Sequence, residues 1–395
     1  MDERRRQLLR VGGAGLFGTG LAGCLGGGGD GSETTTEGSG SDDETESGAD
    51  ADDGGETTDA EGDETTASSD SIDVGMVYAT GGLGDNSFND MAHRGVQDAE
   101  SEYGVSYQNA EPESQSDVES LQRRFAQGSD YDLVCCIGYV QTSALETNAE
   151  RFSDQRFMLV DSVVERDNVS NYTFLEHQGS FQVGHLAGLL TQQDFSAGAG
   201  ETTDDAILGF VGGEETPLIK RFEAGYRAGA AHASEDVEVR SAYAGAYNDP
   251  GTGQSIANSM YDEGADIVYH AAGGTGNGVF QAAQEQGRYA IGVDADQSQS
   301  LPEYSDVILA SMVKHVDEAV FQSVANVVNG EFDGGGVNEL GLEQNGVEAV
   351  YGQQLGSEIP DEVKSALDES REAIVAGDIE VPTRPGEVGA TTTDR

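Results

Sequence analysis

Two loops of this 395-residue chain each place one aromatic residue among small or polar residues, with Gly before it and Asn and Asp directly after it. In the first, residues 81–90 read GGLGDNSFND, so that Phe88 stands beside Asn89 and close to Asp85. The face of an aromatic ring can stack on a planar ligand, and neighbouring amide and carboxylate groups can donate and accept hydrogen bonds. The same residues would also suit a helix start, with Ser87 or Asn89 as the N-cap and Phe88 as a hydrophobic staple. This loop alone leaves both interpretations open.

The second loop repeats this order of residues in the other half of the chain. Tyr247, Asn248 and Asp249 follow a predicted strand, at what we expect to be the matching strand-to-helix turn. Two aromatic rings, one from each half, could close on the two faces of one flat heterocycle. Stacking of this kind contributes about 1–3 kcal/mol per base in nucleic-acid sites. The doubled pattern therefore favours a binding site for a planar ring.

A glycine-rich turn, AAGGTGNG at residues 271–278, follows another predicted strand. Backbone N–H groups without side chains around them can approach a ligand oxygen closely. The spacing does not fit a dinucleotide-binding fingerprint, and no phosphate-loop lysine accompanies it. A tight turn without any ligand is the alternative. The candidate residues of this turn are Gly273, Gly274, Thr275 and Gly276.

Charged residues stand at the ends of three more predicted strands: Asp161 within VDS, Asp294 within GVDADQ and Lys314 within SMVK. A carboxylate at a strand end can accept hydrogen bonds from both hydroxyls of a ribose. Lys314 is one of only three lysines in the chain, which favours a specific role. It could donate to a ligand hydroxyl or pair with Asp294. Any one such acid is more often a helix cap or a solvated charge, so their shared position is what indicates a site.

All these residues follow strands in a regular alternation of strands and helices. Such alternation predicts right-handed βαβ crossovers, parallel sheets and ligand binding beyond the carboxyl ends of the strands. A long apolar-faced helix, predicted over 181–192, interrupts the alternation, which then restarts. The predicted strands span 72–79, 105–109, 133–137, 156–160, 169–174, 206–211, 237–242, 267–270, 289–293, 307–312 and 347–351. The other predicted helices span 90–103, 117–127, 142–151, 218–232, 253–263, 276–286, 315–329 and 360–376.

The repeated series predicts an α/β fold with two lobes and a ligand cleft between them. We expect the N-terminal lobe to comprise residues 71–178 with about 313–345. The C-terminal lobe is expected over 179–312 with about 346–380, followed by a disordered tail at 381–395.

The first 24 residues have the order of an export signal. Arg5 and Arg6, in RRQLLR, resemble a twin-arginine motif; a weakly apolar run follows, and LAGC, ending at Cys24, resembles a lipoprotein cleavage box. We expect the mature chain to begin at lipidated Cys24, anchored on the extracellular face of the cell membrane. Residues 25–70 consist mainly of Gly, Ser, Thr, Asp and Glu, which predicts a disordered acidic tether.

The composition narrows the class of partner. A net charge of −53 excludes nucleic-acid binding that depends on phosphate neutralisation. The abundance of acids and the scarcity of Lys resemble the composition of proteins from extremely halophilic archaea, whose charges need screening by concentrated salt.

Cys135 and Cys136 are adjacent in a predicted buried strand and should point to opposite faces. We therefore expect them to be packing residues rather than a disulfide or a metal site.

Seven motifs together resemble the basic membrane protein (BMP) family, which consists of lipoproteins serving as substrate-binding subunits of nucleoside ABC importers. The motifs are GGLGDNSFND (81–90), VDSVV (160–164), GSFQVG (179–184), PLIKRFEAGY (217–226), AAGGTG (271–276), GVDADQ (292–297) and SMVK (311–314). The resemblance covers about residues 72–345. It implies a type I periplasmic-binding-protein fold, with two Rossmann-like lobes joined by three crossings. It further implies a non-enzymatic protein, which we expect to be monomeric and without cofactor or metal, working with ABC permease and ATPase subunits.

The resemblance also assigns candidate residues to the two halves of a purine nucleoside. Phe88 and Tyr247 would sandwich the purine, with Asn89 and Asp161 on the base edge. Asp294, Lys314 and the turn from Gly273 to Gly276 would hold the ribose, with Asp85 near it. The usual second aromatic of the family is Phe, so the hydroxyl of Tyr247 is a departure that could alter contacts at the ring edge. Residues 217–222 are expected to help line the cleft.

Two other classes of function stay open. A nucleoside hydrolase or nicotinamide enzyme would need metal-binding acids or a nucleophile–base pair, and the six histidines match no such spacing. A sensor lobe that reports ligand to a membrane kinase, or a binder of an amino acid or sugar, is compatible with the sequence. A neighbouring gene set encoding an ATPase and two permeases would separate transport from sensing.

Overall fold

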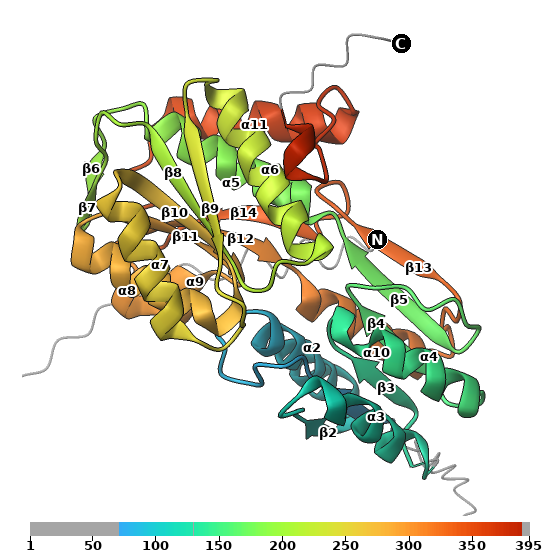
Figure 1. Cartoon of the computed structure of the whole chain (residues 1–395). Helices are drawn as coiled ribbons and strands as arrows, with labels where there is room; N and C mark the ends of the chain where they lie inside the picture. The colour runs from blue at the N-terminus through green and yellow to red at the C-terminus, as the bar shows by residue number, and fades with distance from the viewer. Residues whose placement is uncertain (1–70, 129, 389–395) are drawn as a thin grey trace, which may run out of the picture. The chain divides into compact units, whose positions relative to one another are not determined.

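The computed structural model describes residues 71–128 and 130–388, in which strands and helices alternate largely as predicted (Figure 1). The strands form two six-stranded sheets and one short two-stranded ribbon. The first sheet contains β1 (Asp73–Val77), β2 (Ser106–Ala110), β3 (Leu133–Cys136), β4 (Phe157–Val160), β5 (Val169–Phe174) and β13 (Val337–Leu340). The second contains β8 (Ile207–Gly212), β9 (Glu238–Tyr243), β10 (Ala265–Ala271), β11 (Tyr289–Asp294), β12 (Ile308–Lys314) and β14 (Val347–Tyr351). The ribbon is β6 (Ser196–Ala197) with β7 (Gly200–Glu201).

The two sheets repeat one strand order. The first runs β13-β5-β4-β3-β1-β2 and the second runs β14-β12-β11-β10-β8-β9. Counted along the chain, β1 therefore corresponds to β8, β2 to β9, β3 to β10, β4 to β11 and β5 to β12. All neighbouring strands are parallel except β14, which is antiparallel to β12. The carboxyl ends of the parallel strands in each sheet thus meet at one edge, where loops and helix N-termini converge.

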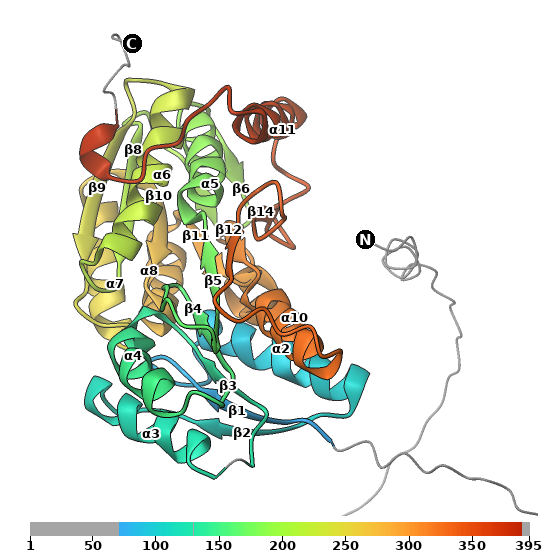
Figure 2. The ribbon, with the colours of Figure 1, turned by 90° about the vertical axis from the view of Figure 1, so that its right-hand side faces the viewer.

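Helices cover both faces of each sheet (Figures 1 and 2). On the first sheet, α2 (Phe88–Tyr103) and α10 (Val316–Val328) pack on one face, and α3 (Val118–Ala126) and α4 (Thr142–Arg151) on the other. On the second, α5 (Glu176–Leu190) and α6 (Pro217–Ala233) cover one face, and α7 (Pro250–Asp262) and α8 (Asn277–Gln286) the other. The short α9 (Gln297–Ser300) follows β11, and α11 (Asp361–Ala376) packs against α5.

The two adjacent cysteines of β3 lie on opposite faces of the first sheet. Cys135 and Cys136 are buried and unpaired, as predicted. Cys135 belongs to the apolar cluster beneath α2 and α10, whereas Cys136 belongs to the cluster beneath α3 and α4. Successive strand residues point to opposite sides, so each thiol fills a different core.

Glycine lets α5 and α6 approach closely. A Cβ atom at Gly225 or Gly229 of α6 would collide with the backbone carbonyl of His177 or Phe181 on α5. The start of α6 is set by Pro217 in its first turn and by the Thr216 side chain, which accepts a hydrogen bond from the Ile219 N–H at 3.3 Å. This helix start faces the carboxyl ends of the strands and so contributes to the site described below.

Two sequence predictions of local structure were wrong, and one strand was missed. The predicted helix 181–192 begins five residues earlier, at Glu176, because that whole helix is buried and lacks a polar face to mark its start. The strand β13 was not predicted; it is a short edge strand with the sequence VNEL, in which polar and apolar residues do not alternate, and it pairs with β5. Part of the predicted tail is folded, since Val381 is buried and a 3₁₀ turn at Pro385–Glu387 packs near α6.

The chain passes between the two sheets at three places (Figure 2). Leu175 joins β5 to α5, His315 joins β12 to α10, and residues 341–346 join β13 to β14. The predicted signal (1–24), Cys24, the tether (25–70) and the last residues of the predicted tail lie outside the described residues. In residues 71–388, apart from position 129, no helix has the length and apolarity needed to span a membrane.

Candidate ligand-binding site

A cavity of about 660 Å³, a volume that includes solvent at its mouth, lies where the carboxyl ends of strands from both sheets meet. Eight of the eleven candidate ligand-binding residues line it: Asp85, Phe88, Asn89, Asp161, Tyr247, Gly273, Asp294 and Lys314. Leu218, Ile219 and Phe222, at the start of α6, line it as well, as expected for residues 217–222.

The remaining three candidates of the glycine-rich turn are not among the lining residues. Thr275 is buried, and its hydroxyl donates to the Ala246 carbonyl at 3.0 Å and accepts from the Asp249 N–H at 2.9 Å. Gly276 packs against the ring of His270, and Gly274 lies near Asn248. Thr275 thus holds the loop that carries Tyr247, and of the four candidates in the turn only Gly273 lines the cavity.

Two aromatic walls of the cavity come from different sheets. Phe88 is the first residue of α2, which follows β1, and Tyr247 lies in the loop after β9. A glycine supports each ring: a Cβ at Gly138 would lie 3.3 Å from Phe88 Cε1, and a Cβ at Gly213 would collide with the Tyr247 ring. Gly138 has φ 97°, a conformation that other residues rarely adopt.

The expectation that these aromatics occupy matching turns is wrong. Phe88 follows β1, whose counterpart in the second sheet is β8, whereas Tyr247 follows β9. The shared order of aromatic, Asn and Asp therefore does not reflect equivalent positions in the two sheets. Asp249 instead caps α7, accepting from the Thr252 N–H at 3.0 Å. The two rings line one cavity because both loops lie at the edge where the sheets face each other.

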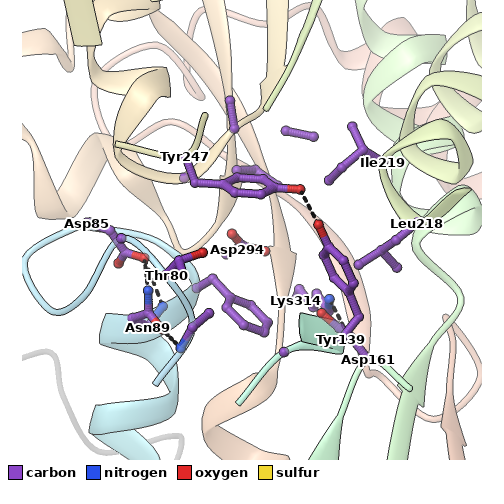
Figure 3. A pocket seen from close by; sticks show the side chains of 18 of the residues that line it. Thr80, Asp85, Asn89, Tyr139, Asp161, Leu218, Ile219, Tyr247, Asp294 and Lys314 are labelled. Carbon is purple, nitrogen blue, oxygen red and sulfur yellow. Dashed lines mark hydrogen bonds and ion pairs between the residues drawn. The ribbon is translucent and has the colours of Figure 1, made fainter. Parts of the chain in front are cut away.

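Ser87 is the N-cap residue of α2, one of the two caps that the sequence allowed, but its side chain makes no capping hydrogen bond and the carboxylate of Asp85 takes that role. This carboxylate accepts from the backbone N–H groups of Ser87 at 2.9 Å, Asn89 at 2.9 Å and Asp90 at 3.2 Å. It also accepts from Asn89 Nδ2 at 3.1 Å, while Asn89 Oδ1 accepts from the Ala79 N–H at 2.9 Å (Figure 3). The Asn89 amide is thereby fixed at both ends and keeps one N–H for a ligand. Burial raises the pKa of Asp85 to about 6, although the backbone hydrogen bonds oppose the shift.

Lys314 lies at the centre of a buried group of charges. Its Nζ is 2.6 Å from Asp161 Oδ1 and 3.4 Å from Glu176 Oε1, and these three side chains are at most 4% exposed. Lys314 thus pairs with Asp161 and Glu176, rather than with Asp294 as one interpretation of the sequence allowed. Its ammonium group also lies 5.0 Å from the centre of the Phe88 ring and 4.9 Å from that of Phe174.

The charges of this group are set by burial and by one another. Burial would lower the pKa of Lys314, but Asp161, Glu176 and Asp294 outweigh that effect, so the pKa is raised and the amine stays charged. Burial raises the pKa of Glu176 above its usual range. Burial likewise raises the pKa of Asp294 to about 6, against the opposing influence of Lys314 and of a hydrogen bond from Ser87 Oγ at 2.5 Å. One buried cation therefore lies among several carboxyl groups with unequal proton affinity.

Two residues of the site were missed from the sequence. Glu176 follows β5 as Asp161 follows β4, and the strand-end rule would have found it if α5 had been predicted to begin there. Tyr139 follows Gly138 at the end of β3, and its ring lines the cavity (Figure 3). An aromatic directly after a strand-end glycine was the available signal. Among residues 71–128 and 130–388, no group of three His, Cys, Asp or Glu side chains is arranged to hold a metal ion.

Comparisons with known proteins agree with this architecture. The family model described as "ABC transporter substrate-binding protein PnrA-like" (Bmp) matches residues 72–384. The ABC transporter nucleoside-binding protein BmpA of Lactococcus lactis is 31% identical, over 79% of this chain and 90% of its own. An uncharacterized lipoprotein of Pyrococcus abyssi is 33% identical, over 80% of this chain and 81% of its own.

A solved structure supports the same conclusion. The ABC transporter solute-binding protein of Aeropyrum pernix K1 superposes with a TM-score of 0.69 at 28% identity, covering 79% of this chain and 93% of its own. The two-lobed type I periplasmic-binding fold expected from the motifs is therefore confirmed. The family model extends over both sheets, and the chain belongs to the Bmp family of PnrA-like ABC transporter substrate-binding proteins.

Proposed function

We propose that this chain is the extracytoplasmic receptor of an ABC importer, which encloses a purine nucleoside and delivers it to the permease. The observation that carries the proposal is that Phe88 and Tyr247, from different sheets, line one cavity together with Asp294 and Lys314. A flat heterocycle and a polyol are the two ligand parts that such walls can recognise. The relation to a nucleoside-binding protein of Lactococcus lactis supports this class of ligand.

The purine would lie between the two aromatic rings. Both rings are supported from behind by glycines, so they are placed before a ligand arrives, which limits the entropy lost on binding. On the base edge, the remaining N–H of Asn89 can donate to a ring nitrogen or a carbonyl oxygen. Asp161 has one oxygen beside Lys314, and its other oxygen can accept from an amino group or a ring N–H.

The ribose would lie against Asp294, Lys314 and Gly273. Asp294 already accepts from Ser87 and has further acceptor capacity for sugar hydroxyls. Lys314 has three donors, of which Asp161 and Glu176 occupy up to two. Asp85, whose carboxylate is engaged by four N–H groups, would act by fixing Asn89 rather than by touching the sugar.

The place of action follows from the terminal sequence. A twin-arginine motif, a cleavage box at Cys24 and a long acidic tether would place the folded part outside the membrane on a lipid anchor. The P. abyssi relative carries the name lipoprotein, in line with such an anchor. The net charge of −53 fits a surface that works in concentrated salt.

The proposal can be tested on the folded protein in molar KCl. We expect mass spectrometry to find a nucleoside that survives purification, and calorimetry to detect binding of adenosine, guanosine or inosine. Uridine and ribose serve as comparison ligands, and chromatography should show that the bound nucleoside is returned unchanged. An absence of heat with all three purine nucleosides would contradict the proposal, and release of free base would indicate an enzyme.

A further inference from the structure

Three polar side chains meet across the mouth of the cavity. The Tyr139 hydroxyl donates to Glu214 Oε2 at 3.0 Å. It also lies 3.4 Å from the Tyr247 hydroxyl (Figure 3). Tyr139 belongs to the 3₁₀ turn after β3, in the first sheet. Glu214 and Tyr247 follow β8 and β9, in the second sheet. The hydrogen bond from Tyr139 to Glu214 therefore joins the two halves of the protein.

These side chains separate the cavity from the outside. Beyond them lies a second, more open hollow, lined among others by Gln115, Glu214, Thr216 and Asn248. Tyr139 and Tyr247 line both the inner cavity and this outer hollow, as do Thr80, Gly81 and Val140. The two tyrosines are thus part of the wall between the two spaces, and a ligand that moves from the outer hollow to the inner cavity passes beside them.

The wall lies away from the places where the chain itself joins the two halves. The crossings at Leu175 and His315 stand beside Glu176 and Lys314, at the inner end of the cavity. The loop before α2 makes a separate set of contacts to the second sheet, from Ser87 to Asp294 at 2.5 Å and from Gln297 Nε2 to the Asn86 carbonyl at 3.0 Å. If the halves move apart about the crossings, the Tyr139–Glu214 hydrogen bond must break.

The hydroxyls have the protonation state that this arrangement needs. Burial raises the pKa of Tyr139 and that of Tyr247 above the ordinary value for tyrosine, so both remain donors at neutral pH. Tyr139 can then donate to the Glu214 carboxylate and accept from Tyr247. A hydrogen bond to an ionised acceptor is among the stronger ones in proteins, which suits a contact that must hold two movable parts together.

We propose that Tyr139, Glu214 and Tyr247 form a gate whose hydrogen bonds keep the cleft closed and set the rate at which ligand leaves. The inference rests on the proposed function, since it gives a kinetic role to three side chains at the mouth of that same cavity. Glu214 and the Tyr139 hydroxyl are positioning groups in this gate, acting on closure. The ring of Tyr247 remains part of the stacking wall.

Conservative variants test the hydrogen bonds of the gate while the shape of the cavity walls is kept. Tyr139→Phe and Glu214→Gln remove or weaken the hydrogen bond while keeping the shape of each side chain. In stopped-flow measurements with inosine in molar KCl, we expect each to raise the dissociation rate by about tenfold, the low end of what loss of a charged hydrogen bond produces. The double variant should be no faster than the faster single variant, because both changes remove one interaction. Tyr247→Phe should have a smaller effect, since its hydroxyl is 3.4 Å from its partner.

Matched controls lie close by in the chain. Tyr131→Phe removes a hydroxyl in the same half of the protein, from a residue outside the cavity lining. Glu215→Gln changes the neighbour of Glu214, an exposed side chain that pairs with Lys220 at 2.8 Å. Both controls should keep the dissociation rate of the unchanged protein. Unaltered rates in Tyr139→Phe and Glu214→Gln, or effects that simply add in the double variant, would overturn the gate.

A ligand-free measurement separates the gate from the proposed function. X-ray scattering of unliganded Tyr139→Phe should give a larger radius of gyration than the unchanged protein and Tyr131→Phe, because the closed form has lost a contact. If the unchanged protein binds no purine nucleoside, the proposed function is wrong. Scattering alone then decides whether these hydrogen bonds keep the cleft closed. A larger radius would support it, and an identical radius would refute it.

Discussion

Asp161 and Asp294 occupy the same position in the two sheets. Asp161 follows β4 directly and Asp294 ends β11, which are corresponding strands, and both backbones are left-handed, with φ 66° and 65°. A non-glycine residue in this region is uncommon, and Asp and Asn are among the few that adopt it at low cost. The repeated conformation turns both carboxyl groups into the shared cavity, one toward Lys314 and the other toward Ser87.

Phe88→Ala should weaken the binding of a purine nucleoside by about 2–4 kcal/mol, because it removes one stacking face and opens the wall. Calorimetry in molar KCl measures the loss. Tyr103→Ala, which removes a partly exposed aromatic from the other end of α2, is the matched control and should leave affinity unchanged. Equal affinity in Phe88→Ala and the unchanged protein would show that the purine does not stack on Phe88.

Lys314→Met should reduce the affinity for nucleoside much more than the affinity for the free base, since the amine is proposed to contact the ribose. Lys220→Met, at a partly exposed surface ion pair, is the control. Equal losses for base and nucleoside would contradict the ribose assignment. The comparison needs only one variant and two ligands, so it does not depend on the absolute affinity.

The same substitution should also lower the free energy of unfolding. Without Lys314, the buried carboxyl groups of Asp161 and Glu176 lose their shared cation, and removal of one partner of a buried pair typically costs about 3–5 kcal/mol. Glu176→Gln in the Lys314→Met background should restore part of the loss, because it removes a buried acid whose remaining ion pair, with Arg221 Nη1 at 3.6 Å, is longer. Denaturant titration measures the free energy of unfolding of the single and the double variant. A double variant less stable than Lys314→Met would show that Glu176 stabilises the fold through other partners.

Nucleoside affinity should fall below about pH 6. The pKa of Asp294 is raised to about 6 by burial, so the carboxyl group becomes protonated as the pH drops through that value and can no longer accept from two sugar hydroxyls. At pH 5, one unit lower, affinity should be about tenfold weaker than at pH 7. The effect of Asp294 on the free energy of unfolding has the opposite dependence on pH. Because its pKa is higher in the folded protein than in the unfolded chain, Asp294 stabilises the fold at a pH below the unfolded pKa, and this contribution is lost as the pH rises through about 6.

Asp294→Asn tests which group is responsible for the pH dependence. Asn tolerates the left-handed backbone at this position, so the fold should survive. The variant should bind more weakly at pH 7 and should lose much of the change between pH 5 and 7. Since the pKa of Asp85 is also raised to about 6, a pH dependence that persists in full would assign the titration to that residue instead.

Stability should increase steeply with salt. With a net charge of −53, the folded chain repels itself, and the Debye length shortens from about 10 Å at 0.1 M to about 3 Å at 1 M. We expect the thermal midpoint to rise continuously between 0.1 and 2 M KCl. Glycine betaine at matched water activity controls for general exclusion effects, and an equal rise in betaine would show that charge screening is not the cause.

Residue type and local hydrophobic periodicity were sufficient to predict much of the fold and several residues of the candidate site. The alternation of apolar strands with helices was sufficient to predict two α/β lobes, because hydrophobic period is a local property of the chain. The strand-end rule placed Asp161, Asp294 and Lys314 at the cavity, since the carboxyl ends of parallel strands necessarily share an edge. A ring among small polar residues likewise marked Phe88 and Tyr247 as residues of that edge.

Tertiary structure alone decided which of these groups meet. Lys314 pairs with Glu176 across more than a hundred residues of sequence, and Tyr139 reaches Glu214 from the other sheet; no spacing along the chain encodes either contact. The similar motifs around Phe88 and Tyr247 lie after non-equivalent strands, and Thr275 supports a loop instead of facing the cavity. The reason is physical: a side chain's neighbours across a cleft depend on how two sheets face each other, and that arrangement is set by packing summed over the whole domain.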